Sequence, residues 1–207
     1  MARPRGPREV EDFVGSSAGG EAPTGLASLL EFTESDPAAQ FLIATAMGPD
    51  GDLVEARLAR GCRAFGVWRE GELAGYGWLS TRPEWIGELE LEITPRTGEA
   101  YIWNCFTLAP HRRRGVLRAL LAGIRARAQS EGLKRIWIGS VAIPAERAFG
   151  PSGFNPALAM TSATIAGFNW LQVRPAAEAD PTLVSAAHQV VATNPGWHLR
   201  RSKKRRH

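Results

Sequence analysis

Apolar residues recur at two different spacings along this chain, and the change of spacing divides it into segments. Residues 24–35 and 37–47 show the three-and-four spacing of amphipathic helices, and 51–60 predicts a shorter helix that ends near Gly61. From residue 62 the spacing shortens to two, which indicates strands. Over 62–108 we expect four antiparallel strands, "CRAFGVWR", "LAGYGWLS", "WIGELELEI" (85–93) and "AYIWNCFTL" (100–108).

The helix predicted over 37–47 has a clear start, because Ser35 or Asp36 can cap it with Pro37 in its first turn. Its apolar spacing is carried by Phe41, Leu42 and Ala46.

The second half of the chain continues this alternation of elements. A helix is predicted over 115–131, and a buried strand over 135–143 follows it. Together with the strand over 100–108 they form a strand–helix–strand sequence, which favours a parallel crossover. A short helix near 144–150, strands near 158–174 and a last helix near 181–192 complete the pattern. The expected fold is an α/β (α+β) domain with a mixed, mostly antiparallel twisted sheet flanked by helices. The helix 115–131 carries its apolar stripe on Val116, Leu117, Leu120, Leu121, Ile124 and Ala128.

The two ends of the chain differ from its body in composition and charge. Residues 1–21 are rich in Gly, Pro, Ser and charge, and predict a disordered tail. We expect a folded domain over 22–176, a C-terminal helix over 177–195 and a basic tail over 196–207. Nine of the 25 basic residues lie in the two ends, which leaves 16 basic and 21 acidic residues and a net charge of −5 in the body. The tail "LRRSKKRRH" is either a disordered, solubilising segment or a weak, non-specific contact to nucleic acid.

The two cysteines, Cys62 and Cys105, show neither metal-ligand spacing nor a disulfide framework, which fits a reducing cytoplasm. No metal site is expected. No apolar run approaches the roughly 18–20 residues of a membrane span, and the first residues lack the apolar core of a signal peptide. We therefore expect a cytoplasmic protein without a membrane partner.

The stretch "HRRRGVLRALL" (111–121) places three arginines directly before a glycine and the start of a helix. A helix N-terminus already carries unpaired N–H groups and partial positive charge, so arginines there are unfavourable unless an anion binds. Gly115 lets the backbone approach a bulky anion, and the N–H groups of 113–118 can converge on one phosphate. The pattern predicts a phosphate-binding loop, and the alternative is a basic, solvated helix start.

Residues 100–131 resemble the central motif of the GNAT superfamily of acyl-CoA-dependent N-acetyltransferases. In that family a strand is followed by Arg or Gln, two residues, Gly, one residue, Gly or Ala, and a helix. Here the motif begins at Arg112, reads "RRRGVL", and has Leu117 at the position of the second small residue. The resemblance extends roughly over 50–170 and implies a sheet splayed between its fourth and fifth strands, 100–108 and 135–143.

The resemblance also implies that acetyl-CoA is the acyl donor and that its pantetheine arm lies in the gap between the splayed strands. Backbone groups at the end of the fourth strand would pair with this arm, and the loop would bind the pyrophosphate. The implied cofactor-binding residues are Phe106, Thr107, Leu108, Arg112, Arg113, Arg114, Gly115, Val116, Leu117 and Arg118.

Two catalytic positions differ from the family pattern. Where several members have a glutamate base, this chain has Tyr101, a poor base near neutral pH. Glu99 lies two residues earlier on the same strand face, so either a Glu99–water–Tyr101 relay operates or Glu99 is an exposed strand-end residue without a catalytic role. Phe149 stands where the family usually has a tyrosine acid. Ser140, Ser152 or solvent would then protonate the leaving thiolate.

The sequence thus predicts a GNAT-type N-acyltransferase that moves an acetyl group from acetyl-CoA to a primary amine of a small molecule or peptide, by direct attack in a ternary complex. The row Glu88, Glu90 and Glu92 would attract a cationic amine or simply face solvent. The rival hypotheses are a CoA-binding module with little or no transfer and a nucleic-acid-associated protein that acts through its basic tail. The identity of the amine stays open, and a homodimer is compatible with the sequence.

Overall fold

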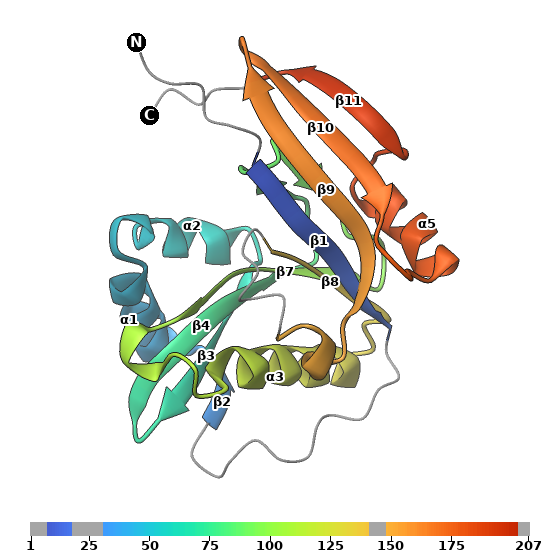
Figure 1. Cartoon of the computed structure of the whole chain (residues 1–207). Helices are drawn as coiled ribbons and strands as arrows, with labels where there is room; N and C mark the ends of the chain where they lie inside the picture. Colours follow the sequence, from blue (N-terminus) through green and yellow to red (C-terminus); the bar gives the residue numbers. More distant parts are fainter. Residues whose placement is uncertain (1–7, 18–30, 141–147, 203–207) are drawn as a thin grey trace.

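The computed structural model describes residues 8–17, 31–140 and 148–202 of the 207-residue chain (Figure 1). Nine of the strands in this part form one sheet, and two more form a separate hairpin. The strands of the large sheet are β1 (Arg8–Ser17), β2 (Glu31–Glu34), β3 (Arg63–Arg69), β4 (Glu72–Ser80), β7 (Glu99–Thr107), β8 (Arg135–Gly139), β9 (Asn155–Ile165), β10 (Phe168–Pro175) and β11 (Gly196–Arg201). The hairpin consists of β5 (Glu84–Ile86) and β6 (Leu91–Ile93). The α-helices are α1 (Pro37–Met47), α2 (Leu53–Ala59), α3 (Val116–Ser130) and α5 (Pro181–Val190), and the short 3-10 helices are η1 (Gly48–Asp50), η2 (Ala109–His111) and η3 (Gly150–Ser152).

The strands of the large sheet lie in the order β11-β10-β9-β1-β8-β7-β4-β3-β2. The neighbours β7 and β8 are parallel and are joined through α3, and the other neighbouring pairs are antiparallel. Strand β7 pairs with β8 only between Glu99 and Ile102, although it continues to Thr107. The predicted mixed, mostly antiparallel sheet that splays between these two strands is therefore confirmed.

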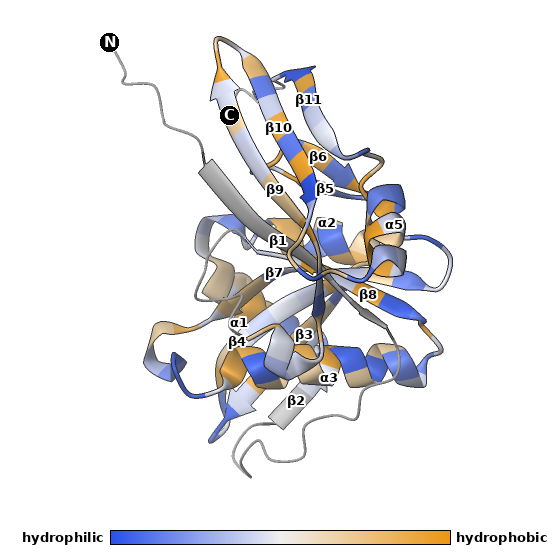
Figure 2. Ribbon diagram, turned by 45° about the vertical axis from the view of Figure 1, so that its right-hand side comes forward, coloured by the Kyte–Doolittle hydropathy of each residue, from blue (hydrophilic) through white to orange (hydrophobic). Residues whose placement is uncertain are grey.

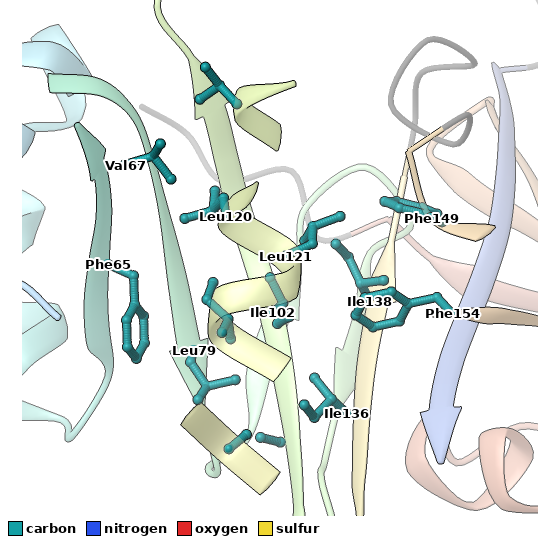
Figure 3. Close-up of a cluster of buried hydrophobic side chains, with 14 of the residues drawn as sticks. Phe65, Val67, Leu79, Ile102, Leu120, Leu121, Ile136, Ile138, Phe149 and Phe154 are labelled. Atoms are coloured by element: carbon teal, nitrogen blue, oxygen red, sulfur yellow. The ribbon is translucent and has the colours of Figure 1, made fainter. Parts of the chain in front are cut away.

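Separate apolar clusters cover the two faces of the sheet. On one face α3 packs on β3, β4, β7 and β8, with Phe65 and Ile102 in its core (Figure 3). On the opposite face α1 and α2 pack over Trp78 and its neighbours. The later strands are covered on that second face by α5 and the β5–β6 hairpin, which share a cluster with Trp137. The arrangement leaves the splay between β7 and β8 in the middle of the molecule.

Several predicted elements are present with bounds close to those expected. The β3–β4 hairpin, the β7–α3–β8 crossover, the β9–β10 hairpin and the last helix all form. Helix α1 starts at Pro37 and is capped by Asp36, whose Oδ1 accepts a hydrogen bond from the N–H of Ala39 at 2.8 Å. Helix α2 is followed by Gly61 in the left-handed conformation that ends many helices (φ 84°).

The single strand predicted over 85–93 is wrong. This segment forms two short strands, β5 and β6, which pair with each other outside the large sheet. A turn separates them, and Glu90 within it has a left-handed backbone (φ 49°). The alternation of Leu89, Leu91 and Ile93 still describes which side chains are buried, because all three lie in the cluster under α5.

The helix predicted over 24–35 is wrong in its last part, because Glu31–Glu34 form strand β2 against β3. For residues 31–34, the backbone hydrogen bonds available at the edge of β3 outweigh a weak local preference for helix. The rest of the predicted helix, up to residue 30, lies outside the described part. The apolar face predicted for α1 is also wrong. Its buried residues are Ala39, Ile43 and Met47, while Phe41 is 71% exposed. The short helix predicted near 144–150 lies largely outside the described residues.

Both chain ends contain strands where tails were predicted. Residues 8–17 do not form part of a disordered tail; they form β1 between β8 and β9, two neighbours that supply hydrogen bonds on both sides. Gly15 suits this place, because a Cβ there would lie 2.7 Å from the ring of Trp137. The predicted basic tail begins with β11, where the apolar residues Trp197 and Leu199 alternate with polar ones and pair with β10.

Candidate active site

The loop between β7 and α3 turns several backbone N–H groups in one direction. Arg113 (φ 60°) and Gly115 (φ 79°) are left-handed, whereas Arg112 is extended and α3 is right-handed. Such an alternation makes successive N–H groups converge on a small concave site that suits an anion. The N–H of Ala119 donates to the C=O of Gly115 at 2.9 Å, so the N–H groups of Val116, Leu117 and Arg118 precede the first bond of the helix.

Strand β4 positions the start of α3. A Cβ on Gly75 would lie 2.7 Å from Val116 Cγ1 and 2.7 Å from the carbonyl oxygen of Phe106, so only glycine allows this approach. Val116 is buried in the cluster under α3, and Leu117 packs against the same cluster. Leu117 therefore points its side chain into the core, and the departure from the small residue of the family motif leaves the N–H groups of the loop exposed.

The end of β7 connects the splayed strand to the loop. The N–H of Leu108 donates to the C=O of Ala74 on β4 at 3.0 Å. Because backbone groups alternate sides along a strand, Phe106 shares the side of Leu108, and Thr107 turns its N–H and C=O toward the gap. The C=O of Thr107 accepts a hydrogen bond from Arg112 Nε at 3.4 Å. Of the three residues predicted to pair with the pantetheine arm, Thr107 has this orientation.

The arginines of the loop are exposed, and one of them lies against an aromatic pair. The guanidinium of Arg112 lies 5.8 Å from the ring centroid of Phe106, which in turn stacks on Tyr76 at 5.8 Å. Arg113, Arg114 and Arg118 extend into solvent. The loop thus combines converging N–H groups with four guanidinium groups, a chemistry suited to a pyrophosphate and a further phosphate.

A β-bulge explains why β7 leaves β8. Tyr76 of β4 pairs with Phe106, and Trp78 pairs with Trp103, so Asn104 and Cys105 together face Gly77. Asn104 has a left-handed backbone (φ 46°), which asparagine tolerates better than most residues. A bulge of this kind bends its strand. It begins two residues beyond Ile102, the last residue of β7 that pairs with β8, and therefore accounts for the gap.

A buried arginine contacts this bulge on the face of the sheet that α1 and α2 cover. Arg57 of α2 is only 7% exposed, and its guanidinium lies 4.4 Å from the Trp103 ring and 5.1 Å from the Trp78 ring. With its amide oxygen toward α2, Asn104 accepts hydrogen bonds from Nη1 and Nη2 of Arg57 at 2.7 and 3.3 Å. Burial lowers the pKa of Arg57. Among the described residues, no carboxylate lies within ion-pair distance of Arg57.

This Arg57 cluster was missed at the sequence level. The only signal was an asparagine in the middle of a strand, a residue that strands disfavour and bulges accept. Nothing in the sequence pairs Arg57 with Asn104, because the contact depends on how α2 crosses the sheet.

Glu99, predicted as a catalytic residue, is enclosed by hydrogen-bond donors. One carboxylate oxygen accepts from Arg135 Nη1 at 2.8 Å, and the other from Trp137 Nε1 at 2.9 Å and the N–H of Arg96 at 3.3 Å. The side chain is buried, so it is not the exposed strand-end residue considered as the alternative. It also lies three residues from the end of the β7–β8 pairing, about 10 Å away along the strand. These contacts favour a role in holding β7 to β8.

Tyr101, the second predicted catalytic residue, lies one residue before the end of this pairing. Its side chain is buried in the cluster that contains Trp137. Burial, followed by the nearby charge of Glu88, raises the pKa of its phenol. Tyr101 therefore keeps its proton well above neutral pH and can donate a hydrogen bond near the gap, but cannot act as a base there.

The region of the missing acid is packed core. Phe149 is buried and its ring lies 6.2 Å from that of Phe154, in the cluster under α3 (Figure 3). The hydroxyl of Ser152 is fully buried and donates to the C=O of Ala148 at 2.7 Å. Ser152 is thus already engaged, and Ser140, directly after β8, lies closer to the splayed edge.

The predicted glutamate row lies on the β5–β6 hairpin and the turn between its two strands. Glu88 and Glu92 are exposed, and Glu90 accepts a hydrogen bond from the hydroxyl of Ser202 at 2.6 Å. Asn169 and Ser162 also bond to the backbone of this hairpin, at Leu89 and Glu88. The row therefore lies over the C-terminal strands.

Both cysteines are free thiols, and burial raises the pKa of Cys105, beside the bulge, to about 12. In the described ranges no three His, Cys, Asp or Glu side chains gather into a metal site. No helix in that part of the chain is long and apolar enough to cross a membrane.

A mixed sheet that splays beside a helix start with converging N–H groups is the fold that the motif at 111–121 predicted. The particular family follows from a direct match: the family model described as "Acetyltransferase (GNAT) family" covers residues 29–150. The chain belongs to the GNAT acetyltransferase family, as the motif at 111–121 predicted.

Solved structures share this fold. The matches include a GCN5-related N-acetyltransferase from Kribbella flavida (TM-score 0.50, 16% identity, 72% of this chain and 55% of that one). They also include one from Sphaerobacter thermophilus (0.53, 13%, 73% and 50%) and a GNAT acetyltransferase from Colwellia psychrerythraea (0.50, 15%, 76% and 56%). The matched regions span about half the length of these proteins. None of the curated proteins compared with the chain matches it.

Proposed function

We propose that this protein transfers an acetyl group from acetyl-CoA to a primary amine by direct attack within a ternary complex. The observation that carries the proposal is the loop at Arg113 and Gly115, whose left-handed residues turn N–H groups outward at the start of α3, beside the splayed end of β7. Family membership supports acetyl-CoA as the donor.

The bound donor would lie along β7. Its pyrophosphate fits the N–H groups of the first turn of α3 and the guanidinium groups of Arg112, Arg113 and Arg114. Its pantetheine arm would run along the unpaired edge of β7, where Thr107 turns its backbone toward the gap. The thioester would then reach the bulge at Asn104, where β7 and β8 separate.

In the chemical step the amine nitrogen attacks the thioester carbon, a C–N bond forms, and the C–S bond breaks to release CoA thiolate. The amine gives up a proton to water, and the thiolate takes one from water or from a nearby donor. Holding the two reactants in line supplies much of the acceleration. Of the two predicted catalytic residues, Tyr101 is the one beside the gap, and we assign it as a hydrogen-bond donor; Glu99 would act only through it.

The loop assignment is tested by Gly115→Glu, which places a negative side chain where the pyrophosphate would bind. Acetyl-CoA should raise the melting temperature of the wild-type protein, and Gly115→Glu should abolish this shift. Gly132→Glu is the matched control, because Gly132 has a similar left-handed backbone (φ 80°), lies just beyond the other end of α3 and has open space around it. Equal shifts in both variants would exclude the loop as the cofactor site.

The catalytic assignment is tested by Tyr101→Phe. We expect kcat to fall about a hundredfold with an unchanged KM for acetyl-CoA, because a hydrogen-bond donor is lost from the reacting centre. Tyr76→Phe, a buried tyrosine on the opposite side of the bulge, is the control. An unchanged kcat in Tyr101→Phe would mean that solvent, and not Tyr101, assists the reaction. If the wild-type protein releases no CoA with any amine tested, the rival hypothesis of a CoA-binding module without transfer would be favoured.

The weak nucleic-acid contact predicted for the basic tail remains a separate hypothesis. Residues 203–207 lie outside the described part, and Arg200 and Arg201 end strand β11. Removing 200–207 should leave acetyl-CoA binding unchanged, because the loop and the gap lie on other strands. It should weaken retention on RNA only at low salt.

A further inference from the structure

The outer face of the last three strands exposes an unusual amount of apolar surface. Strands β9 and β10 bury one set of alternating side chains in the cluster beneath α5 and the β5–β6 hairpin, among them Leu171 and Val173, whereas β11 has no buried residue. Their other face is exposed, and apolar and polar residues alternate along β10 (Figure 2). The large apolar residues that point outward are Ile165 (61% exposed), Phe168 (45%), Trp170 (41%), Trp197 (62%) and Leu199 (53%). We call these five residues the outer apolar patch.

The register brings the members of the patch together. Trp170 pairs with Leu199, and Phe168 pairs with Ile165 across the β9–β10 hairpin. Cross-strand partners share a face, so these side chains lie side by side across all three strands. The exposed parts of the three aromatic rings alone amount to roughly 200–400 Å². Monomeric proteins seldom expose more contiguous apolar surface than this without a binding role.

The charges around the patch have the arrangement of a protein interface. The outward positions of β9, β10 and β11 carry no acidic residue, and their two arginines, Arg174 and Arg201, lie near opposite ends of β10. The centre, around Trp170 and Leu199, is uncharged. An apolar centre with a charged rim is typical of interfaces between proteins. A surface for nucleic acid would need cations across its middle, and aliphatic residues such as Ile165 offer no stacking for bases.

We propose that a second copy of this chain packs on the outer apolar patch, so that two sheets stack face to face. Every molecule presents the same uncharged centre, and most oligomers of soluble proteins are symmetric pairs. A standard interface covers roughly 800 Å² per partner, so the patch would form its apolar centre and the surrounding polar residues its border. Sheets packed in this way lie about 10 Å apart, with side chains of both faces interleaved. The proposal is independent of the acetyl transfer.

The experiment is sedimentation velocity of the full chain across a concentration series, with Trp170→Lys as the first variant. The wild-type protein should dimerise, and Trp170→Lys should raise the dimer dissociation constant at least about 30-fold, as for the loss of a central interface residue. Leu199→Lys should do the same. Phe41→Lys is the control, because Phe41 is more exposed than any member of the patch but lies on α1. It should leave the dimer intact.

Other occupants give different results. Trp170 lies one strand inside the sheet edge, so a dimer formed by pairing of β11 edges would survive Trp170→Lys and would overturn the proposal. A wild-type chain that stays monomeric at all concentrations would also overturn the proposal. Binding of the monomer to single-stranded RNA or to anionic vesicles would then identify a different occupant of the patch. Thermal melts of each variant, with acetyl-CoA shifts equal to those of the wild type, establish that the lysine variants are folded.

Discussion

One half of the sheet consists of strands that are neighbours in the order in which they occur along the chain: β2, β3, β4 and β7. The other half consists of β8, β1, β9, β10 and β11, in which the N-terminal strand β1 lies between strands from the second half of the sequence. We call these the near half and the far half of the sheet. The near half carries the loop, the bulge and helices α1, α2 and α3. The far half carries α5 and the outer apolar patch. One half is built from local contacts and the other depends on the insertion of β1.

The two halves also differ in what glycine does. In the near half Gly75 and Gly77 let strand β4 approach the start of α3 and the bulge of β7, so their absence of a side chain shapes the candidate site. In the far half Gly15 lets β1 fit under Trp137 and α5. Glycine therefore shapes the candidate site in the near half and lets β1 pack into the sheet in the far half. Substitutions of these glycines should affect the two roles separately.

The largest effect is expected from Gly15→Val. A Cβ on Gly15 would lie 2.7 Å from the Trp137 ring and 2.9 Å from Leu183. We expect the free energy of unfolding, measured in urea, to fall by about 3 kcal/mol because the core is overpacked. Gly87→Val is the control, since nothing lies within 4 Å of a Cβ there. Equal effects of the two substitutions would mean that β1 is not held between β8 and β9.

The next effect is expected from Phe149→Tyr, at the position of the missing acid. Phe149 is buried in the near-half core, so an added hydroxyl loses water without a partner, at a cost of about 2 kcal/mol. Acetyl-CoA affinity should stay unchanged and turnover should not rise. Phe168→Tyr, on the exposed face of the far half, should cost nothing measurable. A rise in turnover would instead identify this position as a vacant acid site.

Asn104→Asp should have a smaller effect and of opposite sign. The carboxylate would give the buried guanidinium of Arg57 a charged acceptor in place of an amide, and we expect a gain of about 1 kcal/mol. High salt should reduce this gain only in part, because Arg57 is buried whereas position 104 is exposed. Asn155→Asp on β9 serves as the far-half control. A loss of stability would show that Arg57 does not contact the bulge through this side chain.

The smallest effect concerns the network of Arg63 with Glu34 and Glu131, at 2.6–2.9 Å. Hydrogen bonds from Arg63 lower the pKa of both carboxyl groups, so their contribution is present above the pKa of the unfolded chain and lost as pH falls below it. Arg63→Met should cost about 0.5 kcal/mol at neutral pH, because the pairs are partly exposed. The difference from the wild type should diminish as pH falls through the lowered pKa values of the two carboxyl groups, whereas Arg69→Met should show no such pH dependence.

Local patterns predicted three strands and the longest helix of the near half well. Apolar alternation located β3, β4 and β7, and the stripe of the helix 115–131 predicted the face of α3 that packs on the sheet. The loop could be predicted because its chemistry lies in consecutive residues, three arginines and a glycine before a helix. The bulge at Asn104 and its contact with Arg57 could not, because they depend on how strands and helices far apart in the sequence cross.

The errors in both halves have the same cause. Residues 8–17 have no alternation strong enough to predict a strand. They form one because β8 and β9 supply backbone hydrogen-bond partners on both sides. The face of α1 was misjudged because Phe41 and Ile43 fit similar apolar spacings, and only packing against the sheet decides between them. Glu99 was assigned to chemistry from its strand position, whereas Arg135, Trp137 and Arg96 surround its carboxylate.

The central place of β1 also sets an order of events during synthesis. This strand leaves the ribosome first among the described elements, but the strands on either side of it begin only at Arg135 and Asn155. Before β8 exists the segment has no neighbouring strand, and before β9 exists it has only one, whereas the near half can form without it. Contacts between such distant segments slow folding. A nascent chain stalled before residue 155 should therefore hold a folded near half, with β1 paired on one side at most and cut by a protease more readily than after β9 emerges.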